Sequence, residues 1–158
     1  MKEIFVYSRY AIGVIEPHSE PHIIVSVNCP GDEPAFCRTT RATLGRVNIF
    51  AWDLDHKVPG GIVEYNGMQI PMDAVPDEQL FQPRDAVAII DLVEAHPEAE
   101  HILVHCTAGK SRSAAVAAAL HKVLNGTDEP IFGNKRYTPN MRVYRMVLDE
   151  WYTRHPLE

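Results

Sequence analysis

The chain has 158 residues, of which 46% are hydrophobic and 23% are charged, values close to those of an ordinary soluble globular protein. The formal net charge of −6 argues against binding to nucleic acid or to an anionic membrane, and no apolar run approaches the roughly 18 residues that span a bilayer. The length suits one buried core, so residues 1–158 are expected to form a single domain.

The first part of the chain predicts a strand, a helix and two further strands. Residues 3–7 are a short β-rich run, and Ser8 is suited to cap a helix that continues to Ile15. Residues 22–27 are apolar and β-branched, as in a strand that is buried on both faces. Residues 46–52 predict another strand.

Residues 56–82 predict an insertion that contains a β-hairpin. The runs 62–65 and 68–70 flank Asn66 and Gly67. This pair is a strong two-residue hairpin signal because both positions tolerate positive φ.

The second half predicts three helices and one core strand. Residues 84–95 have a helical apolar period, and residues 102–104 form a short apolar strand. Residues 111–124 predict an Ala-rich helix, and the last helix is expected to start at residues 138–139, with Pro139 in its first turn. This alternation predicts an α/β fold with a central, mostly parallel sheet flanked by helices on both faces. Ligands of such sheets bind beyond the carboxyl ends of the strands.

The cysteine content favours a reducing compartment. Cys29, Cys37 and Cys106 are an odd number and include no Cys-x-x-Cys pair, which argues against a disulfide scaffold or a structural zinc site. The N-terminus lacks the longer apolar stretch of a secretion signal. We therefore expect a cytoplasmic protein.

The segment 105–113 has the pattern of an anion-binding loop. It follows the strand 102–104 directly and leads into the Ala-rich helix. Backbone N–H groups in such a loop point inward, and the positive end of the helix adds to their field, so that a phosphate dianion fits. The expected phosphate-binding residues are Thr107, Ala108, Gly109, Lys110, Ser111 and Arg112.

Cys106 is the expected nucleophile of this loop. The field that attracts phosphate also stabilises a thiolate, which depresses the cysteine pKa. Arg112, six positions later, can bind two equatorial phosphoryl oxygens with its planar fork. Ser113 can donate a hydrogen bond to the sulfur, and Gly109 is expected where a side chain would intrude on the oxygens. His105 is expected to orient the loop rather than to act as a base.

Single residues exclude one similar loop and argue against another. Gly109, Lys110 and Ser111 match the end of a nucleotide-binding Walker loop, but that motif needs glycine where Val104 stands. Rhodanese-type sulfurtransferases place their arginine one residue earlier, where this chain has Ser111. Two alternatives remain, a sulfurtransferase, which the loop length disfavours, and a purely structural role, with Cys106 as a core residue and Arg112 on a helix surface.

The sequence from His105 through Cys106 and five residues to Arg112 and Ser113, preceded by an apolar strand, resembles the active-site loop of the protein tyrosine phosphatase superfamily. In size and helix content the chain is similar to the dual-specificity and small bacterial branches. Residues 137–140 resemble the Pro-Asn segment that opens a late helix in the family. The resemblance implies a phosphatase-like fold and a two-step reaction through a cysteinyl-phosphate, without metal or cofactor.

The resemblance also implies a general acid, an Asp on a mobile loop after a strand. Asp53 follows the strand 46–52 directly and matches the family position best, with Asp55 close behind. The interval from Asp53 to Cys106 is longer than usual for the family, which leaves Asp73 and Asp77 as alternatives. As loop carboxylates, Asp73 and Asp77 are more simply read as solvated side chains or helix caps.

These observations predict a cysteine-dependent tyrosine or dual-specificity phosphatase. Its expected substrate is a phosphorylated protein or a small phosphomonoester of phosphotyrosine type, with no nucleic-acid or membrane partner. A phosphoinositide or another small phosphate is the alternative substrate, and a non-catalytic phosphate-binding module is the alternative of a different class. Cys29 is either a buried thiol or a redox partner of Cys106. Trp52 and Tyr65 can stack on a phenyl ring, although such residues are more often core.

Overall fold

A four-stranded parallel sheet organises the molecule, which we describe from a computed structural model that covers residues 1–157. Its strands, in the spatial order β1-β6-β2-β3, are β1 (Glu3–Ser8), β6 (His101–Cys106), β2 (His22–Asn28) and β3 (Thr43–Phe50). All three strand pairs are parallel, so the carboxyl ends of the strands lie along one edge of the sheet.

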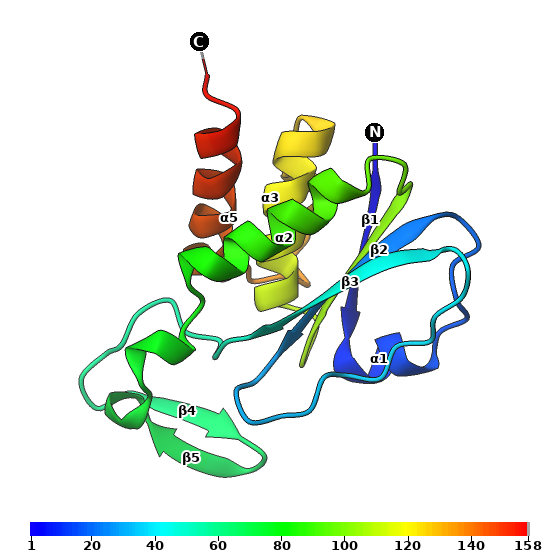
Figure 1. Ribbon diagram of the computed structural model, residues 1–158. Helices are drawn as coiled ribbons and strands as arrows, with labels where there is room; N and C mark the ends of the chain where they lie inside the picture. The colour runs from blue at the N-terminus through cyan, green and yellow to red at the C-terminus, as the bar shows by residue number, and fades with distance from the viewer. Residues whose placement is uncertain (158) are drawn as a thin grey trace.

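Helices cover both faces of this sheet. Figure 1 shows α2 (Pro83–Ala95), α3 (Arg112–Asn125) and α5 (Met141–Arg154) on one face and the short α1 (Arg9–Val14) on the other. The predicted α/β class, with a central parallel sheet between helices, is therefore confirmed. None of the helices within residues 1–157 is long and apolar enough to cross a lipid bilayer.

The core is densest around β2 and α3. Every residue of β2 is buried, as its continuous apolar run predicts. Helix α3 is buried from Arg112 through Leu120 because it lies between the strands β1 and β6 and the helices α4 (Glu129–Phe132) and α5. Its alanines allow this close approach on all sides. The amino end of α3, which follows the predicted anion-binding loop, is thereby fixed inside the molecule.

The bounds 46–52 predicted for the next strand are wrong at both ends, because β3 covers Thr43–Phe50. Thr43 pairs with His22 of β2, so contact with a neighbouring strand extends β3 beyond its own apolar run. After Phe50 the chain leaves the sheet, and Trp52 makes only an isolated bridge to Leu80.

Two predicted helix starts also differ from the structure. Helix α5 begins at Met141 because Asn140 is its N-cap and accepts a hydrogen bond from the Val143 N–H at 3.1 Å. Pro139 therefore precedes the cap and does not lie in the first turn. Similarly, α3 begins at Arg112, and Ser111 is the N-cap residue.

The predicted hairpin is present as β4 (Ile62–Tyr65) and β5 (Met68–Pro71). Asn66 and Gly67 have φ values of 51° and 77°, as a two-residue turn with positive φ requires. Two short 3₁₀ helices, η1 (Met72–Ala74) and η2 (Asp77–Gln79), connect the hairpin to α2. The hairpin forms its own sheet beside the parallel one (Figure 1).

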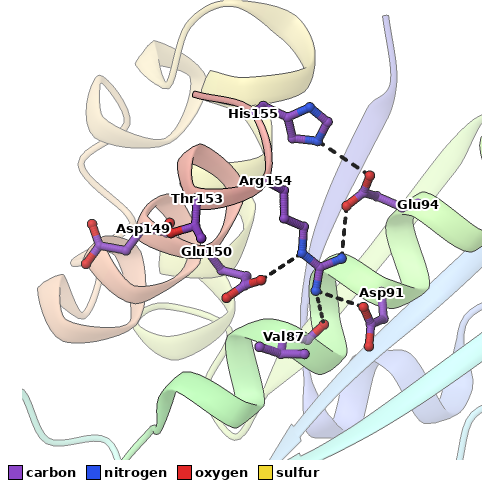
Figure 2. A network of polar contacts seen from close by, with 8 residues as sticks. All are labelled: Val87, Asp91, Glu94, Asp149, Glu150, Thr153, Arg154 and His155. Carbon is purple, nitrogen blue, oxygen red and sulfur yellow. Dashed lines mark hydrogen bonds and ion pairs between the residues drawn. The ribbon is translucent and has the colours of Figure 1, made fainter. Parts of the chain in front are cut away.

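Arg154 joins the last helix to α2 through several carboxylates (Figure 2). Its guanidinium contacts Asp91 at 2.8 Å and Glu94 at 2.9 Å on α2, and Glu150 at 2.7 Å on its own helix. One Nη also donates to the Val87 carbonyl at 3.4 Å. A network of this kind stabilises more than an isolated surface ion pair does.

Replacing Arg154 with methionine is expected to lower the thermal midpoint of unfolding by a few degrees, because α5 loses its polar contacts to α2. Arg145→Met, which changes an exposed arginine on the same helix, is the matched control and should leave the midpoint nearly unchanged. Differential scanning calorimetry at low and high salt measures both variants. Equal midpoints for the two variants would show that the network adds nothing to stability.

Candidate active site

Cys106 is the last residue of β6 and is 2% exposed. Its Sγ lies 3.0 Å from the Ser113 Oγ. Burial alone would raise the pKa of the Cys106 thiol, but the charge of Arg112 and hydrogen bonds from the Ser113 hydroxyl and from the backbone N–H groups of Ser113 and Gly109 lower this pKa below its ordinary value. The amides of Ser113 and Gly109 therefore converge on the sulfur, and together with Arg112 they stabilise the thiolate relative to the thiol.

Arg112 is a buried cation whose hydrogen bonds go only to neutral acceptors. Nη1 donates to the Ala51 carbonyl at 2.8 Å and contacts the Cys29 Sγ at 3.5 Å. Nη2 donates to the Thr107 Oγ1 at 3.0 Å, and the buried Nε has no partner among residues 1–157. A buried positive charge is costly without an anion, so this guanidinium is suited to bind an oxyanion.

Gly109 is required by the close approach of the neighbouring strand β1. Its φ of 71° favours glycine, and a Cβ at this position would lie 2.8 Å from the backbone N of Ser8. A side chain at this position would therefore clash with β1, and its expected intrusion on phosphate oxygens stays a prediction. Lys110 is exposed, and its carbonyl accepts a hydrogen bond from the Thr138 N–H at 2.8 Å.

His105 lies beneath the loop and is fully buried. Its Nε2 is 2.6 Å from the Ser26 Oγ. Burial lowers the pKa of His105 to about 4, with smaller lowering effects from Arg46, Arg9 and Arg112, against a raising hydrogen bond to the Cys106 carbonyl. The imidazole is neutral near pH 7, and its contacts suit a residue that orients the loop.

The shifted pKa of His105 predicts a pH-dependent stability. The unfolded chain protonates this group near pH 6.5, but the folded protein does so only near pH 4. The contribution of His105 to the free energy of unfolding is therefore fully present above pH 6.5. It is lost as the pH decreases toward 4, by up to about 3 kcal/mol. Urea unfolding at neutral pH and near pH 4.5 measures the decrease in the free energy of unfolding on acidification. This decrease should be smaller for His105→Gln than for the wild type.

His56→Gln removes an exposed histidine and is the control for that experiment. The decrease in its free energy of unfolding at acid pH should equal that of the wild type. If His105→Gln behaved in the same way as His56→Gln, the buried imidazole would not be the source of acid sensitivity.

A pocket of about 430 Å³ lies over Cys106 and Arg112. It is bounded by loops at the carboxyl edge of the sheet and by the hairpin. Its lining residues are Arg9, Cys29, Asp32, Trp52, Asp53, Val63, Glu64, Tyr65, Asn66, Cys106, Thr107, Ala108, Ser111 and Arg112. Of the sequence-predicted site residues at this loop, His105, Gly109, Lys110 and Ser113 do not line the pocket.

The structure separates the four candidate general acids. Asp53 lines the pocket, and its Oδ1 accepts hydrogen bonds from the Ser111 Oγ at 2.7 Å and the Asn140 Nδ2 at 2.9 Å. Asp55 instead accepts from the backbone N–H of Arg142 at the start of α5. The two remaining candidates do not line the pocket; Asp73 lies in η1, and Asp77 pairs with Lys57 at 2.7 Å.

No protein-family model matches the chain, and none of the curated proteins matches it. Several solved structures, by contrast, do match the chain. The human tyrosine phosphatase-like serine/threonine/tyrosine-interacting protein superposes with a TM-score of 0.59 at 15% identity, over 98% of this chain and 93% of that chain. Human DUSP28 superposes with a TM-score of 0.52 at 15% identity, over 96% and 94% of the two chains. The chain has the fold of the dual-specificity phosphatases. At this identity the likeness concerns the fold, and membership of the small bacterial branch stays a prediction.

Sequence reasoning missed several residues that this phosphatase fold brings to the pocket, among them Arg9 and Asp32. Arg9 is the first residue of α1, and its guanidinium donates to the Asn28 Oδ1 at 2.9 Å and to the Glu33 carbonyl at 2.8 Å. No local motif marks it. Strand order is the signal that would have located it, because Ser8 pairs with Cys106 in the β1–β6 register.

Cys29 also lines the pocket of this phosphatase fold. It is 8% exposed, and its Sγ lies 3.7 Å from the Thr107 Oγ1. This position beside the loop is compatible with either alternative, a buried thiol or a redox partner of Cys106. The redox role stays a prediction.

Proposed function

We propose that this protein is a cysteine-dependent phosphatase that hydrolyses phosphotyrosine-type phosphomonoesters through a cysteinyl-phosphate. The supporting observation is the combination, in one pocket, of a Cys106 thiol with a lowered pKa and an Arg112 guanidinium whose hydrogen bonds within residues 1–157 go to neutral acceptors. A thiolate needs an electrophile, and a guanidinium whose hydrogen bonds go to neutral acceptors can bind the oxygens of an anion. A phosphoryl group is both at once.

In the first step the Cys106 thiolate attacks phosphorus while the bond to the leaving oxygen breaks. Arg112 and the loop amides bind the equatorial oxygens, whose charge spreads in the transition state. Asp53, the proposed general acid, gives its proton to the leaving oxygen, so that an alcohol or phenol departs.

In the second step water attacks the cysteinyl-phosphate, and the Asp53 carboxylate takes the proton from that water. The phosphorus–sulfur bond breaks, phosphate is released, and Cys106 leaves as a thiolate. The Ser113 hydroxyl, 3.0 Å from the sulfur, stabilises the departing thiolate by donating a hydrogen bond. The cycle closes without a metal ion in either step.

A non-catalytic phosphate-binding module is the second candidate. One neighbour is itself named a tyrosine phosphatase-like interacting protein, so the fold alone does not decide between catalysis and binding. The lowered pKa of Cys106 supports catalysis, because a module that only binds an anion gains nothing from stabilising a second negative charge beside it.

Phosphate release from a phosphotyrosine peptide, compared with release from an inositol phospholipid, tests the proposal. We expect faster turnover of the peptide and no loss of activity with EDTA. Tight phosphate binding without turnover of either substrate would favour the binding module. Faster turnover of the lipid would support the phosphoinositide alternative, and loss of activity with EDTA would contradict the metal-free mechanism.

A further inference from the structure

The β4–β5 hairpin contributes four consecutive residues to the wall of the pocket that contains Cys106. They are Val63, Glu64, Tyr65 and Asn66. The hairpin belongs to its own two-stranded sheet, so the parallel sheet does not need it for strand pairing (Figure 1). Its place at the pocket therefore points to a role in what the pocket accepts.

Tyr65 is held at two points within this wall. Its ring packs edge-on against Trp52, with the centroids 5.1 Å apart and an interplanar angle of 87°. Its hydroxyl donates a hydrogen bond to Asp32, another pocket residue. Trp52 is buried, and its Nε1 donates to the Gln79 Oε1 at 2.9 Å. The partly buried Tyr65 ring is thus fixed before any ligand arrives.

The rest of the hairpin is anchored by apolar contacts. Val63, Ile70 and Met72 pack with Tyr65 on a buried cluster beneath the hairpin. The buried members of that cluster are Cys29, Trp52, Leu54, Val75 and Leu80. Since Cys29 and Trp52 also line the pocket, the same cluster supports the hairpin and the pocket wall. A fixed aromatic wall loses little side-chain entropy when a ligand packs on it.

We propose that the hairpin selects the leaving group, with Tyr65 as a specificity-determining residue that packs against a flat aromatic ring. This inference rests on the proposed phosphatase function and assigns the insertion to substrate choice. Aromatic pairs gain energy beyond the area they bury, which a serine, threonine or inositol leaving group cannot match. Phosphate binding stays with Arg112 and the loop, and the hairpin discriminates between esters.

The test compares a phosphotyrosine peptide with the same peptide carrying phosphothreonine. Tyr65→Ala should lower kcat/KM for the phosphotyrosine peptide about tenfold, mainly through KM, because the ring contact exists in both ground and transition states. The value for the phosphothreonine peptide should change by less than about twofold. Tyr65→Phe keeps the ring and should keep the preference.

Met68→Ala is the matched control, since Met68 lies on the same hairpin, is 61% exposed and does not line the pocket. Met68→Ala should leave kcat/KM unchanged for both peptides. Dissociation constants of both peptides for the Cys106→Ser protein give a second reading that does not depend on turnover. An equal loss for both peptides with Tyr65→Ala, or no loss, overturns the inference and leaves the phosphatase proposal intact. A folded wild type without turnover of either peptide overturns the proposed function, and the inference with it.

Discussion

Cys106→Ser is expected to reduce kcat for a phosphotyrosine peptide by about 10⁴-fold or more, a loss typical of a removed nucleophile. A serine hydroxyl is protonated at neutral pH and needs a base to attack. The neighbouring imidazole of His105 is fully buried and hydrogen-bonded to the Ser26 Oγ at 2.6 Å, so it is not placed to serve as that base. Phosphate release in initial-rate assays measures the loss.

The same variant should still bind inorganic phosphate. Arg112 and the loop amides remain, and removal of the thiolate charge reduces repulsion of the dianion. Isothermal titration should give a dissociation constant equal to or lower than that of the wild type. Cys29→Ser, which changes the other thiol of the pocket, is the control and should stay within about tenfold of wild-type turnover. A larger loss for Cys29→Ser than for Cys106→Ser would mean that the nucleophile is misassigned.

Elements with strong local signals could be predicted from the sequence. The turn at Asn66 and Gly67 needs positive φ at both residues, and the structure has φ values of 51° and 77° there. The apolar run of β2 predicted a strand buried on both faces, and every one of its residues is buried. Strand starts that depend on a partner distant in the sequence were missed. An example is the start of β3 at Thr43, which pairs with His22.

The residues of the candidate site also differ in whether local sequence could predict them. The order Cys106, loop, Arg112 is continuous in sequence, so both residues could be placed at one strand–helix junction. Arg9 and Asp32 reach the pocket only because β1 and β2 both lie beside β6, a property of strand order and not of local sequence. Likewise, the Asn66-Gly67 turn predicted a hairpin but gave no information on where it would pack.

Asp53→Asn is the substitution with the second-largest expected effect. We expect kcat for a phosphotyrosine peptide to fall by about 10²–10⁴-fold, as for a lost general acid. Asparagine keeps an Oδ1 that can accept from Ser111 and Asn140, the two donors 2.7 and 2.9 Å from this oxygen, so the loop should keep its position. The loss should be much smaller for 4-nitrophenyl phosphate, whose leaving group departs without protonation.

The pH profile separates an acid from a merely structural carboxylate. A general acid must be protonated, so wild-type kcat should fall on the alkaline side of the profile, and Asp53→Asn should lack this limb. Asp55→Asn keeps an oxygen that can accept the Arg142 N–H but removes the negative charge at the amino end of α5, so it should lower stability while leaving the limb intact. Asp32→Asn tests the other aspartate of the pocket. If Asp32→Asn or Asp73→Asn removed the limb and Asp53→Asn kept it, the proton donor would be that residue, and the hydrogen bonds from Ser111 and Asn140 would only fix the loop.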